Sequence, residues 1–100
     1  MKKILNVIDI YSCDGEDFPT EVTPYEDIDS ARQYLADRLE WYKKETYIEQ
    51  LVDEQGNFDL NEFDEDCGDY ADVSADSVDI SYSAKDLQLS LYIEKKEIRS

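Results

Sequence analysis

Residues 45–84 contain no lysine, arginine or histidine, and this stretch limits what the chain can fold into more than any other. It carries 13 of the 26 carboxylates of the 100-residue chain, and so supplies −13 of the net charge of −16. Like charges at this density repel one another and oppose compaction. The thirteen acids are Glu45, Glu49, Asp53, Glu54, Asp59, Glu62, Asp64, Glu65, Asp66, Asp69, Asp72, Asp76 and Asp79.

Apolar residues are interleaved with these acids, which argues against a fully disordered segment. Disordered acidic segments are poor in aromatic and β-branched residues. This stretch contains Tyr47, Ile48, Leu51, Val52, Phe58, Leu60, Phe63, Tyr70, Val73, Val78, Ile80 and Tyr82. We therefore expect a folded acidic face that holds the carboxylates in fixed positions, with residues 64–69 as its most mobile part. The alternative is a solvated acidic loop, which is the common outcome for a charge run.

The regular patterns of the chain predict strands at both of its ends. Residues 77–83 and 87–94 alternate between apolar and polar side chains on either side of a short link, which predicts a C-terminal β-hairpin with one buried face. Residues 4–11 are almost continuously apolar, as in a strand covered on both faces. Residues 18–25 contain Pro19 and Pro24, which lack amide hydrogens, and this favours an edge strand or an extended loop.

One main helix is predicted over residues 30–44. Ser30 and Gln33 have the spacing of a capping box. The apolar stripe of the helix consists of Ala31, Leu35, Leu39 and Tyr42. Thr46 and Glu49 form a second capping box, which predicts a short helix ending near Gly56, although a continuation of the first helix remains open.

These elements predict one α+β domain that spans residues 1–100. An antiparallel or mixed sheet of three to five strands would pack one face on the main helix. Residues 57–63 fit either a short strand or a helical turn, and residues 62–70 fit a loop punctuated by Gly68.

Catalysis is not expected. Without histidine there is no Ser-His or Cys-His dyad, and three glycines cannot build a phosphate-binding loop. Cys13 and Cys67 are too few for structural zinc, and no cofactor is indicated. A disulfide between them is open, but two reduced thiols in a cytosolic protein are the expected state. No stretch has the length of a signal peptide core or a membrane span, so we expect a cytoplasmic protein of a bacterial host.

Residues 59–69 are rich in oxygen ligands but do not match the EF-hand pattern of a calcium-binding loop. In an EF-hand loop that starts at Asp59, Phe63 would occupy a ligand position and Asp64 would replace the required glycine. Loops that start at Asn57 or Asp64 also fail. A calcium-responsive module with another type of site remains an alternative function.

Partner binding is the function that the acidic stretch favours. Carboxylates at alternating positions of a strand lie about 6.7 Å apart on one face and can present a ladder of charge, as a nucleic-acid backbone presents phosphates. Such a surface could occupy a basic nucleic-acid-binding groove of another protein. The residues that we expect to bind the partner are Asp59, Glu62, Asp64, Glu65, Asp66, Asp69, Tyr70, Asp72, Asp76 and Asp79.

In size, net charge and the acid-and-tyrosine run of residues 59–72, the chain resembles the small acidic inhibitors carried by phages and mobile elements. These are the anti-CRISPR and anti-restriction proteins, several of which mimic DNA. The resemblance implies a non-catalytic inhibitor whose partner is a CRISPR effector or a restriction enzyme, without contact to nucleic acid or membrane. An acidic interaction or accessory domain with an unrelated partner is the alternative. If the acids only solubilise the chain, Trp41 and residues 13–25 form the next candidate surface.

Overall fold

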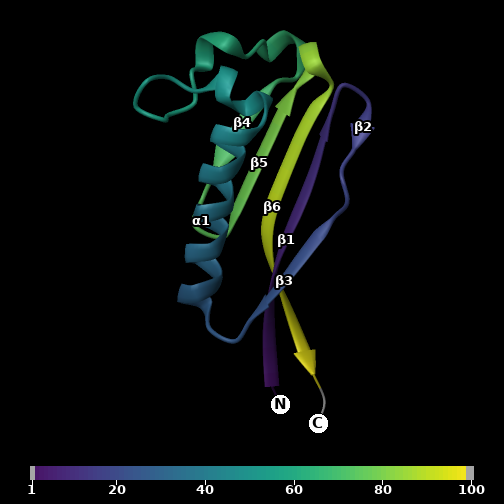
Figure 1. Cartoon of the computed structure of the whole chain (residues 1–100), viewed down its shortest axis with the longest axis vertical. Coiled ribbons are helices and arrows are strands. Elements are labelled where there is room, and N and C mark those ends of the chain that lie inside the picture. The colour runs from purple at the N-terminus through teal and green to yellow at the C-terminus, as the bar shows by residue number, and fades with distance from the viewer. Residues whose placement is uncertain (1, 99–100) are drawn as a thin grey trace.

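The computed structural model describes residues 2–98, which form one α-helix, six strands and four short 3-10 helices (Figure 1). The α+β class and the C-terminal hairpin are therefore confirmed. The strands are β1 (Lys2–Cys13), β2 (Glu16–Asp17), β3 (Glu21–Tyr25), β4 (Tyr70–Val73), β5 (Ser77–Tyr82) and β6 (Leu87–Ile98). The helices are α1 (Ile28–Glu45), η1 (Tyr47–Leu51), η2 (Leu60–Glu62), η3 (Glu65–Cys67) and η4 (Ser83–Lys85).

All strand pairs are antiparallel, and the order across the sheet is β2-β1-β6-β5-β4, with β3 also paired to β1. The first and last strands pair along their whole lengths, so they form the centre of the sheet (Figure 1). The six strands exceed the predicted three to five. The strands that the sequence patterns did not indicate are the two-residue β2 and β4, a four-residue edge strand inside the acidic run, and both are too short and too polar to show a clear alternation.

Helix α1 covers one face of the sheet, and the predicted stripe is buried against it. The sheet contributes Leu5, Val7, Tyr11, Val78, Ile80, Leu87, Leu89 and Leu91 to this core. The predicted start of the helix at Ser30 is wrong. Asp27 is the N-cap, and its Oδ2 accepts a hydrogen bond from the Ser30 amide at 2.8 Å. Asp27 is favoured because its carboxylate also accepts from the Ser30 hydroxyl at 2.8 Å.

The opposite face of the sheet carries no helix within residues 2–98, so the prediction that β1 is covered on both faces is wrong. Ile10 and Val22 are exposed on this uncovered face. Ile8 is buried there because its cross-strand neighbours Val22 and Tyr92 flank it on either side. The apolar character of β1 is thus satisfied by α1 on one face and by neighbouring strands on the other.

The segment between α1 and β4 crosses one end of the sheet (Figure 1). Its second helix exists as the 3-10 helix η1, which buries Ile48 and Leu51. Thr46 caps it by accepting from the Ile48 amide at 3.2 Å, not through the predicted box with Glu49. Residues 57–63 combine both alternatives, because Phe58 forms an isolated antiparallel bridge with Val52 and residues 60–62 form η2. No helix within residues 2–98 combines the length and apolarity that a membrane span requires.

Candidate partner-binding surface

The structure separates the ten predicted partner-binding residues into three places. Six lie in the segment that crosses the end of the sheet: Asp59, Glu62, Asp64, Glu65, Asp66 and Asp69. Tyr70, Asp72 and Asp79 lie on β4 and β5, with Asp72 directly opposite Asp79. Asp76 lies in the turn between these two strands. The predicted set is therefore not one uniform patch, and its members have to be judged one by one.

Asp69 is an internal residue of the fold. Its side chain is 6% exposed and accepts hydrogen bonds from the Asp64 amide at 3.0 Å and the Ser83 amide at 2.7 Å. Burial raises the pKa of Asp69, but these amide hydrogen bonds outweigh burial, so its pKa lies below the ordinary value. Asp69 connects the end segment to the start of η4 and is not available to a partner.

Asp59 and Asp64 hold the 3-10 turns of the end segment. Asp59 Oδ1 accepts from the Asn61 amide at 3.0 Å, and Asp64 Oδ1 accepts from the Asp66 amide at 3.0 Å. Gly68 closes η3 with a φ of 84°, a value that favours glycine. The predicted loop thus consists of capped turns in which the chain's own acids satisfy backbone amides.

The two cysteines are both free. The Cys67 thiol donates to Asp64 Oδ2 at 3.2 Å, and this hydrogen bond to a carboxylate raises the pKa of the thiol. A raised pKa keeps Cys67 in the protonated form, which is the less nucleophilic state. The Cys67 thiol is therefore not an activated nucleophile.

Glu62, Glu65 and Asp66 are exposed, and none of their side chains makes a hydrogen bond or an ion pair within residues 2–98. They differ in this respect from the three capping or buried acids of the same segment. Their charges face solvent directly.

Asp72 and Asp79 occupy directly opposed positions on the uncovered face. Two like charges across an antiparallel pair destabilise the sheet. Asp79 accepts from the Tyr70 hydroxyl at 3.3 Å and from the Ser90 hydroxyl at 3.4 Å, whereas Asp72 accepts no side-chain hydrogen bond in the described residues. The Asp79 charge raises the pKa of Tyr70, which keeps this 44% exposed tyrosine neutral. Tyr70 is therefore an exposed aromatic beside two carboxylates, and not a core residue.

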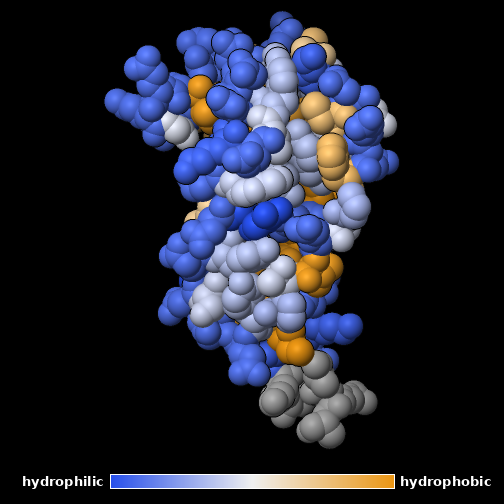
Figure 2. Space-filling view, viewed as in Figure 1, coloured by the Kyte–Doolittle hydropathy of each residue, from blue (hydrophilic) through white to orange (hydrophobic). Residues whose placement is uncertain are grey.

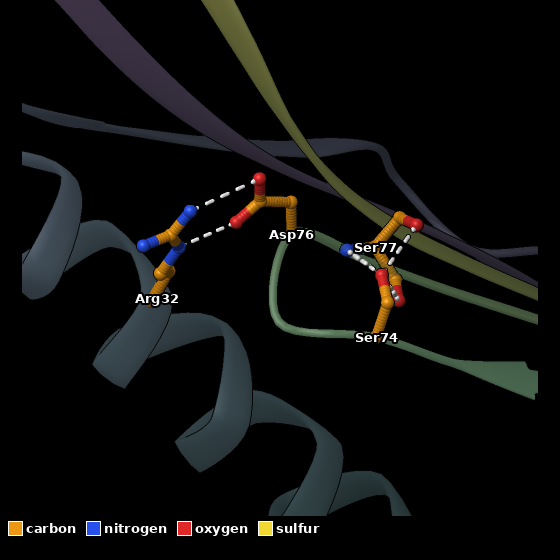
Figure 3. A network of polar contacts seen from close by, with 4 residues as sticks. All are labelled: Arg32, Ser74, Asp76 and Ser77. Atoms are coloured by element: carbon orange, nitrogen blue, oxygen red, sulfur yellow. Dashed lines mark hydrogen bonds and ion pairs between the residues drawn. The ribbon is translucent and has the colours of Figure 1, made fainter.

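Asp76 is neutralised within the chain. Arg32 on α1 makes two contacts to its carboxylate, Nε to Oδ1 at 2.5 Å and Nη2 to Oδ2 at 3.3 Å (Figure 3). The hydrogen bond from Arg32 lowers the pKa of Asp76. Ser74 and Ser77 hydrogen-bond to each other beside it and close the turn. Asp76 ties the β4–β5 turn to the helix and is the only one of the thirteen acids of residues 45–84 in an ion pair with a described residue.

Five exposed members of the predicted set neither cap a turn nor form an ion pair with a described residue: Glu62, Glu65 and Asp66 on the end segment, and Asp72 and Asp79 beside Tyr70 on the uncovered face of the sheet. Together with Tyr70 we call them the acidic surface. Among residues 2–98, no three acidic or cysteine side chains converge in a way that could hold a metal ion. The arrangement therefore offers charge and one aromatic ring to a partner.

A cavity of about 530 Å³, which we call the aromatic pocket, lies between the C-terminal half of α1 and the chain that runs from β1 through β2 to β3. Figure 2 shows hydrophobic side chains along this β2–β3 edge and a smaller hydrophobic group at the upper left, among side chains of intermediate or hydrophilic character. Trp41 and part of residues 13–25, the second candidate surface predicted from the sequence, contribute to the lining of this pocket. The signal that could have found the pocket is the set of aromatic residues within and on either side of residues 13–25, because Phe18 contacts Tyr11, Tyr11 contacts Tyr42, and Tyr42 contacts Trp41.

Arg38 forms one wall of the aromatic pocket. Its Nε donates to Asp9 Oδ2 at 2.7 Å and its Nη2 lies 3.3 Å from Glu21 Oε2. Asp9 is 2% exposed, and its other oxygen, Oδ1, has no hydrogen-bond partner. A buried carboxylate requires such a cation, so Arg38 holds α1 against β1 and β3. Burial also raises the pKa of Tyr11 to about 12, so its ring stays neutral.

Comparisons with protein-family models, curated proteins and solved structures give no match. A functional proposal has to rest on the geometry and charge of the chain itself.

Proposed function

We propose that the chain is a non-catalytic protein that binds, through the acidic surface, a basic nucleic-acid-binding surface of a nucleic-acid-processing enzyme. The observation that supports this most is the exposure of five carboxylates that form no ion pair with a described residue, two of them beside Tyr70, in a stretch of forty residues without a cation. A groove of lysine and arginine that binds phosphates would be attracted to the same array of negative charge.

The mode of action would be competition. A protein that occupies the basic groove excludes DNA or RNA from it and needs no catalytic residue of its own. This mode fits the anti-CRISPR and anti-restriction inhibitors that the sequence resembles. The chain would then act in the cytoplasm of a bacterial host. A CRISPR effector or a restriction enzyme is the corresponding partner.

The opposed pair Asp72 and Asp79 adds a physical argument. Their repulsion costs stability in the free chain. A partner that brings a lysine or arginine between them would relieve this cost, so part of the binding energy would come from removing strain in the acidic surface.

The experiment is a competition assay. Immobilised chain captures its partner from a lysate of the organism that encodes it, and duplex DNA or RNA is then added. We expect nucleic acid and added salt to release the partner, and the partner to lose its ability to load DNA in an electrophoretic assay when the chain is present. A partner that binds the chain and its nucleic acid at the same time would contradict the proposal.

A second candidate, an interaction domain without nucleic-acid competition, is favoured by one observation. Ile10 and Val22 are exposed side by side with Ile8 on the uncovered face of the sheet. A partner held by this apolar patch would stay bound at high salt, because the hydrophobic effect is not screened by ions. The salt step of the competition assay therefore separates the two candidates.

A further inference from the structure

The aromatic pocket combines two kinds of group that attract organic cations. Its aromatic walls are Tyr11, Phe18, Trp41, Tyr42 and Tyr47, and its acids are Asp14, Glu16, Glu21 and Glu45. Aromatic ring faces attract ammonium and guanidinium groups, most strongly where the cation loses water. Carboxylates at the same cavity add a charge-assisted hydrogen bond to such a group.

The chain already shows that these rings accept a guanidinium. The Arg38 Cζ atom lies 4.6 Å from the centroid of the Trp41 ring and 5.2 Å from that of Tyr42. Trp41 nevertheless remains 45% exposed, so much of its indole surface is still accessible to a second group.

The charges of the aromatic pocket are not balanced from within. Arg38 is the one cation of its lining, and it is bound to Asp9 and Glu21. Asp14, Glu16 and Glu45 make no ion pair with any described residue. Three carboxylates beside exposed aromatic rings therefore lack a counter-charge, and a cation supplied from outside would complete the site.

We propose that the aromatic pocket binds the guanidinium or ammonium group of an arginine or lysine side chain presented by a protein partner. A protein is the preferred source because arginine, tryptophan and tyrosine are the residues in which interface energy concentrates. The inference deepens the proposed function, on which it rests for the basic character of the partner. It adds a second contact, on a different part of the chain from the acidic surface.

The pocket can be tested without the partner, by titrating the full chain with N-acetyl-arginine amide and following the indole N–H signal of Trp41 by NMR. The chain has one tryptophan, so this signal is unambiguous. N-acetyl-lysine amide tests the ammonium group. N-acetyl-citrulline amide is the control, because it has nearly the shape of the arginine probe without its charge. We expect saturable shifts with the two cations and none with citrulline. Equal shifts with citrulline, or shifts that do not saturate, would overturn the proposal.

Two variants locate the binding. The double change Glu16→Gln with Glu45→Gln should weaken the arginine probe by about tenfold, because two carboxylates at the pocket lose their charge. The matched control, Glu26→Gln with Glu97→Gln, removes the same charge from exposed positions outside the aromatic pocket and the acidic surface, and should leave the probe affinity unchanged. Equal weakening by both variants would show general attraction to a negative protein and would overturn the site. Circular dichroism verifies that each variant is folded.

The partner is tested in a separate arm. The Glu16→Gln and Glu45→Gln chain should retain less of the captured partner than the wild type does. Unchanged retention would overturn a protein as the source of the cation. A partner that is captured but does not compete with nucleic acid would refute the proposed function alone, since the arginine titration does not depend on that competition.

Discussion

Asp66 and Asp69 stand three positions apart in the same acidic run, but their surroundings are opposite. Asp66 is exposed without a side-chain partner, whereas Asp69 is buried and accepts two backbone amides. The same contrast separates the exposed Asp72 from Asp9, which is buried against Arg38. At the scale of a residue, a carboxylate of this chain therefore either faces solvent or supports the fold, and its burial and hydrogen bonds decide which.

Asp69→Ala should lower the free energy of unfolding by about 1–3 kcal/mol, because two buried amides lose their acceptor. Asp66→Ala should change it by less than about 0.5 kcal/mol, as is usual for an exposed position. Urea denaturation measures both. Equal stabilities of the two variants would mean that the Asp69 hydrogen bonds do not form in solution.

The pH dependence of Asp69 has a definite sign. Its folded pKa lies below the ordinary value of 3.8, so its stabilising contribution is fully present above that value and is lost as the pH falls through the folded pKa. The difference in unfolding free energy between the wild type and Asp69→Asn should be constant near neutral pH and shrink below about pH 4. A difference that grows in acid would contradict the assignment.

At the scale of an element, helix α1 begins at a cap that its sequence did not indicate. Ser30 and Gln33 fit the capping-box pattern, but Asp27 performs the role because it satisfies both the amide and the hydroxyl of Ser30. The hydrogen bond from the Ser30 amide lowers the pKa of Asp27. The N-cap is therefore Asp27, which makes the hydrogen bonds, and not Ser30, which matches the capping-box spacing.

The two candidate caps can be separated by mutation. Asp27→Ala should lower Tm by about 4–8 °C, because the helix loses its N-cap. Ser30→Ala should leave Tm nearly unchanged, since the Asp27 carboxylate still accepts from the backbone amide of residue 30. Thermal unfolding followed by circular dichroism decides the matter. A larger loss in Ser30→Ala would restore the cap at Ser30.

The periodicity of the sequence predicted the elements that bury one regular face. It did not predict the short edge strand or the surroundings of individual acidic side chains. The stripe of α1 and the alternation of β5 and β6 follow from burial on one side, which leaves a period in the sequence. Strand β4 leaves no such period because it has four residues at the edge of the sheet. Within the predicted partner-binding set, no sequence pattern distinguishes the buried Asp69 or the ion-paired Asp76 from the exposed acids.

At the scale of the whole molecule, a net charge of −16 is distributed over a body with extents of 48 × 29 × 24 Å. Four ion pairs link the described side chains, and they leave most acids without a cation. The fold tolerates this charge by placing it at the surface, at a cost in stability that a basic partner would remove.

Salt should stabilise the free chain. Ions screen repulsion over roughly 8–10 Å at ordinary ionic strength, so Tm should rise as sodium chloride increases from about 0.01 M to about 0.15 M. Asp72→Asn should raise Tm at low salt and reduce this dependence, because it removes the charge opposite Asp79. A Tm that is flat or falls with salt would show that the acids do not repel one another in the folded chain.

The most direct test of the account compares two variants of equal charge. One neutralises the acidic surface through Glu62→Gln, Glu65→Gln, Asp66→Asn, Asp72→Asn and Asp79→Asn. The other neutralises five exposed acids elsewhere, through Glu26→Gln, Asp29→Asn, Asp37→Asn, Glu40→Gln and Glu97→Gln. Both change the net charge from −16 to −11.

The measurement is the affinity of each variant for the partner captured in the competition assay, at one fixed salt concentration. The account predicts that the acidic-surface variant loses affinity by at least about tenfold and that the other variant changes little. The reason is that binding would depend on where the charges lie and not on the net charge. Equal affinities of the two variants would contradict it, and would reduce the acidic surface to a solubilising one.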